Sequence, residues 1–302
     1  MSDTCSSHFS FSEQLKQAEF HPETFPHWIC RNFLPEALLK PLASRFPTSQ
    51  AIHHFTKPNT PYTQNTAYPW EFTSLPADLT ELNTVASAWT AQKQDLIQFI
   101  HPHLPPHLQT HLQELIDHTE SRGDGRATSP CTMEGTTQLG PHCDNPKELL
   151  AGLIYLRDDR DQGEGGALDI YALRNPNRTR YMSAKRRIPS RYLTKIRSIP
   201  YASNTAVFFV PTHLAIHGVS SRDITTHDRR LINLSIEITK QSNLKLWDPQ
   251  RHLHRRHELN LRLAHRAAKL ARQAGLSTIS KVLSEIGSSG EIYNFINSKR
   301  LR

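Results

Sequence analysis

Three side chains of metal-binding types stand out by their spacing. His142 and Asp144 are separated only by Cys143, and His217 follows 73 residues after the aspartate. Two imidazoles and one carboxylate can occupy one face of an octahedral metal ion and leave three positions for other ligands. Neutral imidazoles and a hard carboxylate suit ferrous iron, so the pattern favours a metal centre that activates oxygen. The expected metal ligands are therefore His142, Asp144 and His217.

The closely spaced pair is weak evidence when it stands alone. A chain with 18 histidines is expected to hold about one such triplet by chance, with His142 in a loop and Asp144 starting a turn. Two features favour ligands instead. Residues two apart in an extended segment share a face, with Cys143 pointing away. Both histidines also lie near strand-like apolar segments, where a rigid sheet can aim them.

An arginine pair follows the second histidine, at positions 229 and 230. The segment around it alternates, with Ile232, Leu234 and Ile236 on one face. Arg230 shares that face, which we expect to point into a β-barrel, whereas Arg229 is expected to point toward solvent. A guanidinium can grip a carboxylate through two parallel hydrogen bonds, so Arg230 is the candidate for binding a diacid.

Helices are expected before these residues. Apolar side chains recur at helical spacing over residues 36–46 and 79–100, and a shorter helix is expected over 107–118. Four prolines predict an irregular segment over 50–77, and Ser121 to Gly125 predicts a flexible break.

From about residue 128 the pattern changes to short strands joined by Gly and Pro turns, which is typical of a sandwich or a barrel. Strands are expected over 153–156, 167–171, 206–210 and 230–239, with a glycine turn at 163–166. The expected fold class is α+β with a mainly β core. The expected parts are an N-terminal helical support region (1–125), a β core (126–242) and a basic C-terminal helical extension (243–302).

The order of these pieces resembles the double-stranded β-helix, or jelly roll, of the Fe(II)/2-oxoglutarate-dependent dioxygenase superfamily, particularly its prolyl-hydroxylase-like branch. The resemblance covers roughly the central third of the chain, from Cys131 to Ile238. It is carried by His142-Cys143-Asp144-Asn145-Pro146, Ile154-Tyr155-Leu156, Gly165-Gly166-Ala167-Leu168-Asp169-Ile170, Val207-Phe208-Phe209, His217-Gly218-Val219 and Arg229-Arg230-Leu231-Ile232-Asn233-Leu234.

The resemblance implies that His142, Asp144 and His217 hold Fe(II), with 2-oxoglutarate and O2 as co-substrates and ascorbate as an activator. Arg230 would bind the distal carboxylate of 2-oxoglutarate. Tyr155 stands where similar enzymes donate a phenol to the same carboxylate, and a plain core tyrosine is the alternative. The implied reaction couples decarboxylation to succinate with hydroxylation of a substrate. Related halogenases carry a small residue in place of the aspartate, so Asp144 argues against halogenation.

Basic residues are concentrated in two segments. Residues 251–302 hold 11 Lys/Arg against three Glu, whereas the first 250 residues are balanced. Ile170 to Ser221 contains nine basic residues and no acid. Two basic segments on a neutral body favour an acidic partner. We expect the long segment 171–203 to form a substrate lid, with a disordered insertion as the alternative.

Several substrates fit an acidic preference. The leading interpretation is the Kdo sugar of lipopolysaccharide or a lipid A precursor, because the features are similar to those of Kdo 3-hydroxylases. Hydroxylation of a prolyl or other protein residue is the alternative among enzymes. A basic nucleic-acid-binding protein with an inactive barrel is the alternative from another class, which the sparse aromatics of 170–200 disfavour. The sequence leaves the acceptor atom and the oligomeric state open.

The sequence predicts a soluble cytoplasmic protein. Residues 1–12 lack a basic n-region and an apolar h-region, and no apolar run approaches the roughly 20 residues that span a bilayer. The four cysteines lie far apart, which predicts free thiols in a reducing compartment. An apolar stripe beside basic residues near 255–274 would allow residues 251–302 to contact an anionic inner membrane peripherally.

Overall fold

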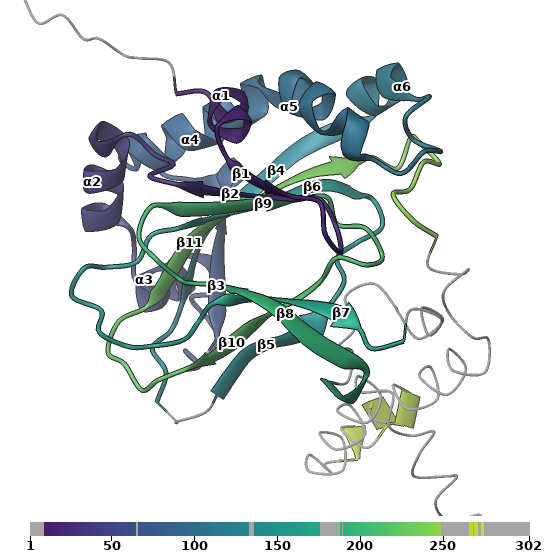
Figure 1. Cartoon of the computed structure of the whole chain (residues 1–302). Coiled ribbons are helices and arrows are strands. Elements are labelled where there is room, and N and C mark those ends of the chain that lie inside the picture. Colours follow the sequence, from purple (N-terminus) through teal and green to yellow (C-terminus); the bar gives the residue numbers. More distant parts are fainter. Residues whose placement is uncertain are drawn as a thin grey trace, which may run out of the picture.

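Two antiparallel sheets face each other at the centre of the chain, and helices cover the outer face of the larger sheet (Figure 1). The computed structural model describes residues 9–64, 66–132, 136–175, 188, 190–248, 266–267, 269–270 and 273–274. The prediction of a mainly β core with helical support is confirmed.

The larger sheet has seven strands and the smaller has four. In spatial order the larger contains β1 (Glu19–His21), β2 (His27–Arg31), β9 (Thr205–Phe209), β6 (Glu148–Tyr155), β11 (Arg229–Ile238), β4 (Thr119–Thr128) and β3 (Ala67–Glu71). The smaller contains β5 (Thr136–His142), β10 (Ile216–Arg222), β7 (Leu168–Leu173) and β8 (Leu193–Ile199).

From β4 to β11 the chain crosses to the other sheet after every strand except at the β7–β8 hairpin. This crossing separates sequence neighbours and pairs distant strands, so β11 lies between β6 and β4, and β10 between β5 and β7. Such alternation between two sheets is the jelly roll that the sequence predicted. Its consequence for the site is that β5 and β10 become neighbours.

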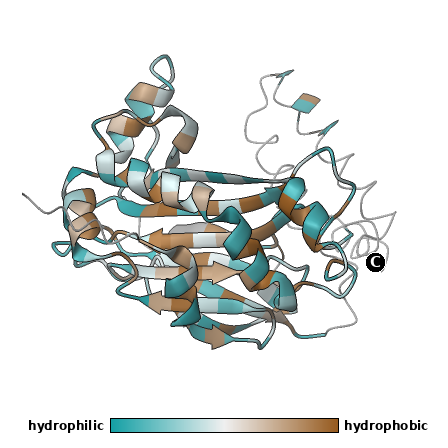
Figure 2. Ribbon diagram, turned by 90° about the horizontal axis from the view of Figure 1, so that it is seen from above, coloured by the Kyte–Doolittle hydropathy of each residue, from teal (hydrophilic) through white to brown (hydrophobic). Residues whose placement is uncertain are grey.

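Helices pack on the larger sheet through an apolar layer that we call the outer core. In it the Trp89 ring stacks on Phe208 at 6.2 Å, and its Nε1 donates to the Ser235 carbonyl at 3.3 Å. Figure 2 looks down on this layer and shows brown residues along the strands beneath the helices. The helices are α1 (Phe11–Lys16), α2 (Glu36–Arg45), α3 (Ser49–Thr56), α4 (Thr80–Ala91), α5 (Lys93–Ile100) and α6 (Leu112–Asp117), with short 3-10 turns at Phe72–Ser74, His101–His103 and Ser190–Tyr192.

A smaller apolar layer, the inner core, lies between the two sheets. It draws side chains from both sheets and from the turns at their ends. Its buried members are Phe25, Ile29, Ala151, Tyr155, Leu168, Ile170, Ile199, Tyr201, Val207, Phe209, Ala215 and Leu231.

Three local predictions from the sequence were wrong. The segment 50–77 contains α3 and β3, and β3 accommodates Pro69 because it is an edge strand that needs no donor there. The expected flexible break at 121–125 lies within β4. Its glycines allow close packing, since a Cβ on Gly123 would lie 2.4 Å from the Phe72 ring. The boundary expected between residues 125 and 126 therefore falls inside a strand.

The segment 171–203 is not one long loop. Residues 193–199 form β8, which pairs with β7 and completes the smaller sheet. The central residues of the expected lid, including Arg186 and Arg187, lie outside the described residues. Most of the extension at 243–302 lies outside them as well.

The expected helix over 79–100 is divided into α4 and α5, and the one over 107–118 is shortened to α6. Cys30, Cys131 and Cys143 are buried free thiols, as expected. Among the described residues, no helix combines the length and apolarity needed to cross a bilayer.

Candidate metal centre

The three predicted ligands come together at the ends of two paired strands. His142 ends β5 and is the direct register partner of His217 on β10. Asp144 follows two residues later, with His142 Nε2 3.5 Å from its Oδ1 and His217 Nε2 3.5 Å from its Oδ2. One donor atom from each residue lies within 4.8 Å of the other two, so the group could hold a metal ion.

Backbone carbonyls fix the orientation of both imidazoles. Nδ1 of His142 lies 3.0 Å from the Gly140 carbonyl, and Nδ1 of His217 lies 3.0 Å from the Ala215 carbonyl. Each Nδ1 therefore donates its proton to a carbonyl, which leaves Nε2 as the ligand atom. Metal-binding histidines are commonly oriented in this way, so the donor set fits Fe(II).

Burial and charge act differently on the two rings. Burial lowers the pKa of His217, which favours the neutral imidazole that a metal needs. Burial also lowers the pKa of His142, but the hydrogen bond and charge of Asp144 outweigh it, and the net shift is upward. A divalent cation would compete with a proton at this site.

Cys143 is not part of the ligand set. Its side chain is fully buried, and Sγ donates to the His213 carbonyl at 3.3 Å. Burial raises the pKa of this thiol, so it stays protonated. The prediction that Cys143 points away from its two neighbours agrees with this contact.

The prediction for the arginine pair was wrong in its choice of face. Arg229 is 4% exposed, its Nε donates to the Gly166 carbonyl at 2.9 Å, and its Cζ lies 5.2 Å from the Tyr155 ring centroid. Arg230 points to the other side of β11, where its Nη1 donates to the Ala43 carbonyl at 3.3 Å and lies 4.0 Å from Asp158.

The error has a simple physical cause. Alternation correctly predicted that Ile232, Leu234 and Ile236 share one face, but that face packs in the outer core under the helices. Leu231, on the face of Arg229, belongs to the inner core. A strand buried on both sides gives no periodic signal that tells its two faces apart.

Arg229 is a buried cation with unused hydrogen-bonding capacity. Its Nη2 and the Tyr155 hydroxyl have no hydrogen-bond partner among the described residues. Burial lowers the pKa of Arg229 and raises that of Tyr155, and each shift reflects the cost of charge in a dry site. Unsatisfied buried donors are costly, so this pair favours a bound acceptor.

The donor pair and the candidate metal ligands lie on either side of the space that the inner core fills. Tyr155 is the register partner of Leu231 on β11, and Ile170 is the register partner of His217 on β10. Leu231 and Ile170 both belong to the inner core. The candidate metal ligands and the donor pair therefore face the same interior, from opposite sheets.

The sequence did not predict that Gly166 and Tyr201 contact the two arginines of β11. Gly166 was interpreted only as part of a turn, but its positive φ of 73° aims its carbonyl at Arg229. Tyr201 follows β8, which was not predicted, and its Oη accepts the Arg230 backbone N–H at 2.8 Å. Only the Gly-Gly pair at 165–166 could have signalled an unusual backbone in advance.

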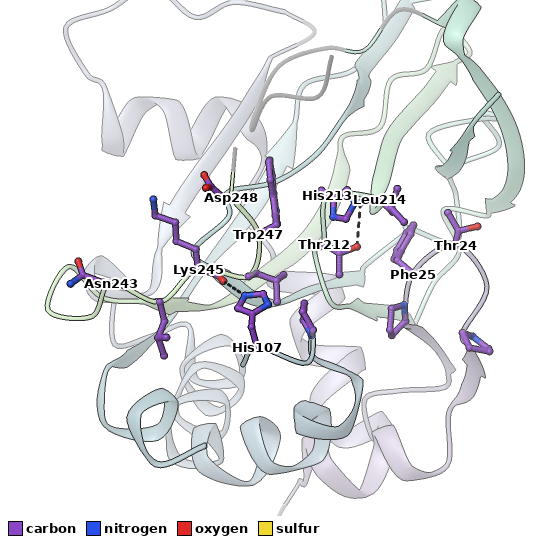
Figure 3. A pocket seen from close by; sticks show the side chains of 15 residues that line it. Thr24, Phe25, His107, Thr212, His213, Leu214, Asn243, Lys245, Trp247 and Asp248 are labelled. Carbon is purple, nitrogen blue, oxygen red and sulfur yellow. Dashed lines mark hydrogen bonds between the residues drawn. The ribbon is translucent and has the colours of Figure 1, made fainter. Parts of the chain in front are cut away.

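A pocket of about 770 Å³ (Figure 3) is lined by residues that contact neighbours of the candidate ligands. Its wall includes His213, whose carbonyl holds Cys143, and Leu246, whose N–H donates to the Pro146 carbonyl at 2.6 Å. Phe25 at its edge contacts the Phe209 ring, which in turn contacts the His217 ring at 4.9 Å. The other lining residues are Pro22, Thr24, Pro26, Pro105, His107, Thr212, Leu214, Asn243, Leu244, Lys245, Trp247 and Asp248.

No protein-family model and no curated protein matches this chain. Among solved structures it is similar to a prolyl-4-hydroxylase of Pseudomonas putida (12% identity, 75% of this chain and 96% of that chain, TM-score 0.42). It is also similar to a viral collagen prolyl hydroxylase of Paramecium bursaria Chlorella virus-1 in complex with 2-oxoglutarate (12%, 71% and 96%, 0.37). A third is a prolyl hydroxylase of Trichoplax adhaerens with a hypoxia-inducible-factor peptide (14%, 75% and 87%, 0.40).

Proposed function

We propose that this chain is an Fe(II)- and 2-oxoglutarate-dependent hydroxylase. The observation that carries the proposal is the pairing of two features across one interior: a His-Asp-His group suited to iron, and a buried arginine with no carboxylate partner among the described residues. A diacid that reached from the first feature to the second would satisfy both.

Each protein group has a separate task in this proposal. Fe(II) held by His142, Asp144 and His217 would supply the oxygen chemistry that decarboxylates 2-oxoglutarate and hydroxylates the substrate. Arg229 binds the distal carboxylate of 2-oxoglutarate through Nη2, and the Tyr155 hydroxyl donates to the same group. The raised pKa of Tyr155 keeps its hydroxyl protonated as a donor. The apolar inner core excludes water from the co-substrate.

The direct test is turnover of 2-oxoglutarate. Purified protein with Fe(II), ascorbate and O2 should convert 2-oxoglutarate to succinate, which is measured by chromatography. A His142→Ala variant is the control for free iron in the assay. No succinate above that control, with iron bound, would refute the proposal.

For the substrate we propose an acidic sugar, with Kdo on lipopolysaccharide or a lipid A precursor as the specific candidate. The sequence supports an acidic substrate through the acid-free segment from Ile170 to Ser221. Arg197 adds support because it is the register partner of Ile170, which pairs with His217. Its Nη1 contacts His21 at 2.9 Å and Glu19 at 3.8 Å, and an acidic substrate would compete with Glu19 for this cation. Directly paired residues share a face, so Arg197 lies on the ligand face two strands away, at about 10 Å.

The acceptor is tested by offering candidates separately. A Kdo-bearing lipid A precursor, but not a proline-rich peptide, should gain one oxygen atom by mass spectrometry and stimulate succinate formation. Arg197→Gln should weaken use of the acidic acceptor and spare succinate formation without it. Hydroxylation of the peptide alone would favour a protein-residue hydroxylase instead.

A further inference from the structure

Tyr201 lies beside Arg229 in the interior and contacts three arginines. The centroid of its ring is 5.1 Å from Arg229 Cζ, 5.2 Å from Arg222 Cζ and 5.9 Å from Arg157 Cζ. The side chain is 1% exposed and packs edge-on against Tyr155 at 5.4 Å. An aromatic face attracts guanidinium groups, most strongly where water is excluded.

The three arginines differ in how their charge is compensated. Arg222 forms a buried ion pair with Asp161. Arg157 donates to the carbonyls of Tyr201, Asp161 and Gly163, lies 3.5 Å from the Asp161 carboxylate through Nε, and has about a quarter of its side chain exposed. Arg229 has no ion pair among the described residues, and its compensation comes from the Gly166 carbonyl and the two tyrosine rings.

Gly166 fixes the other edge of the same guanidinium. Its carbonyl accepts from Arg229 Nε at 2.9 Å, while the buried Nη2 has no partner among the described residues. A Cβ on Gly166 would lie 3.3 Å from Cδ of both Arg222 and Arg229, so this turn passes tightly between them. The direction of Nη2 is therefore set by the carbonyl on one side and by the rings on the other.

We propose that Tyr201 is a positioning residue that holds Arg229 for the distal carboxylate, and so makes the site select a 2-oxo diacid over a 2-oxo acid with an uncharged chain. This inference rests on the proposed function. The ring carries the role, because it faces the guanidinium, whereas the hydroxyl is occupied by the Arg230 N–H.

The test compares binding of two ligands by calorimetry, using protein loaded with Mn(II) so that binding is separated from turnover. The ligands are 2-oxoglutarate and 2-oxopentanoate, which has the same chain length without the distal carboxylate. Tyr201→Met should weaken 2-oxoglutarate binding about tenfold and change 2-oxopentanoate binding less than about twofold. Tyr201→Phe keeps the ring and should restore the preference for the diacid. Equal weakening of both ligands would indicate a purely structural role and overturn the inference.

Tyr68→Met is the matched control, because that buried ring contacts Tyr62 and His53 rather than an arginine. If Tyr201→Met melts below the temperature of the measurement, Tyr201→His replaces it, and the ratio of the two affinities is evaluated in the same way. Wild-type protein that binds neither ligand would refute the proposed function. Wild-type preference for the diacid that persists in the Tyr201 variant would refute only the role of Tyr201.

Discussion

The outer and inner cores differ in size and in the buried polar groups that lie within or beside them. The outer core packs aromatic and aliphatic side chains such as Phe11, Phe33, Trp89 and Phe208, and the indole N–H of Trp89 has carbonyl partners. The inner core is smaller and includes Tyr155, whose hydroxyl, like Nη2 of the adjacent Arg229, lacks a partner among the described residues. The larger apolar layer supplies most of the burial that stabilises the fold, so the layer next to it can tolerate unsatisfied donors that a ligand would complete.

The largest effect is expected when one of the candidate metal ligands beside the inner core is removed. His217→Ala should abolish succinate formation because the metal loses one of its three protein ligands, while the melting temperature of the metal-free protein changes little. Metal content by atomic emission and turnover by succinate formation are both measured. His53→Ala, which removes a buried histidine near Tyr62 and Tyr68, is the control and should keep turnover. Full turnover in His217→Ala would contradict the assigned centre.

The reverse experiment removes a side chain from the outer core. Leu234 is fully buried beside Phe208, and Leu234→Ala should lower the free energy of unfolding by about 3 kcal/mol through lost burial and a cavity. Denaturant unfolding measures this change. The 2-oxoglutarate requirement at a temperature where the variant is folded should stay the same. A large change in that requirement would mean that the two cores are not separable.

The next prediction compares the two arginines of β11, of which Arg229 faces the inner core and Arg230 faces the side covered by helices. Arg229→Met should raise the 2-oxoglutarate concentration needed for half-maximal turnover about 30-fold, because a charged hydrogen bond to the carboxylate is lost. It should also stabilise the ligand-free protein, because an unpaired buried cation is removed. Arg230→Met should leave the requirement nearly unchanged. Steady-state kinetics and thermal melts provide the measurements, and the opposite ranking would restore the original assignment to Arg230.

The smallest expected effect belongs to Tyr155. Tyr155→Phe removes one neutral donor and keeps the ring, so 2-oxoglutarate binding should weaken about fivefold. Calorimetry measures that affinity, with Tyr171→Phe as the control on the opposite face of the smaller sheet, where its hydroxyl donates to Asp169. An unchanged affinity in Tyr155→Phe would make Tyr155 a plain core residue, the alternative that the sequence left open.

The sequence predicted what depends on local pattern. The strands at 153–156, 167–171, 206–210 and 230–239 correspond to β6, β7, β9 and β11, because each combines apolar residues with nearby turn residues. The candidate metal ligands could be named because their chemistry is specific and the spacing of His142 and Asp144 fits an extended segment. Their convergence could not be measured from the sequence, since it depends on the register of β5 with β10.

Other features depend on tertiary contacts that leave no local signal. β8 was hidden in a basic segment, and β4 contains two glycines that pack against Phe72 and Leu82. The choice between Arg229 and Arg230 required knowing that helices cover one side of β11. That knowledge concerns the packing of layers, and a period of two residues carries none of it.

Because His142 and His217 are register partners, a metal ion bound by both would couple metal binding to folding. The two imidazoles belong to strands far apart in the chain, so a cation bound by both would cross-link β5 and β10. A ligand present at 100 times its dissociation constant adds about 2.7 kcal/mol to the stability of the state that binds it. Loaded protein should therefore exchange its β5 and β10 amide protons more slowly than protein treated with a chelator. Loss of the metal would then lower the local stability of the smaller sheet more than that of the helices.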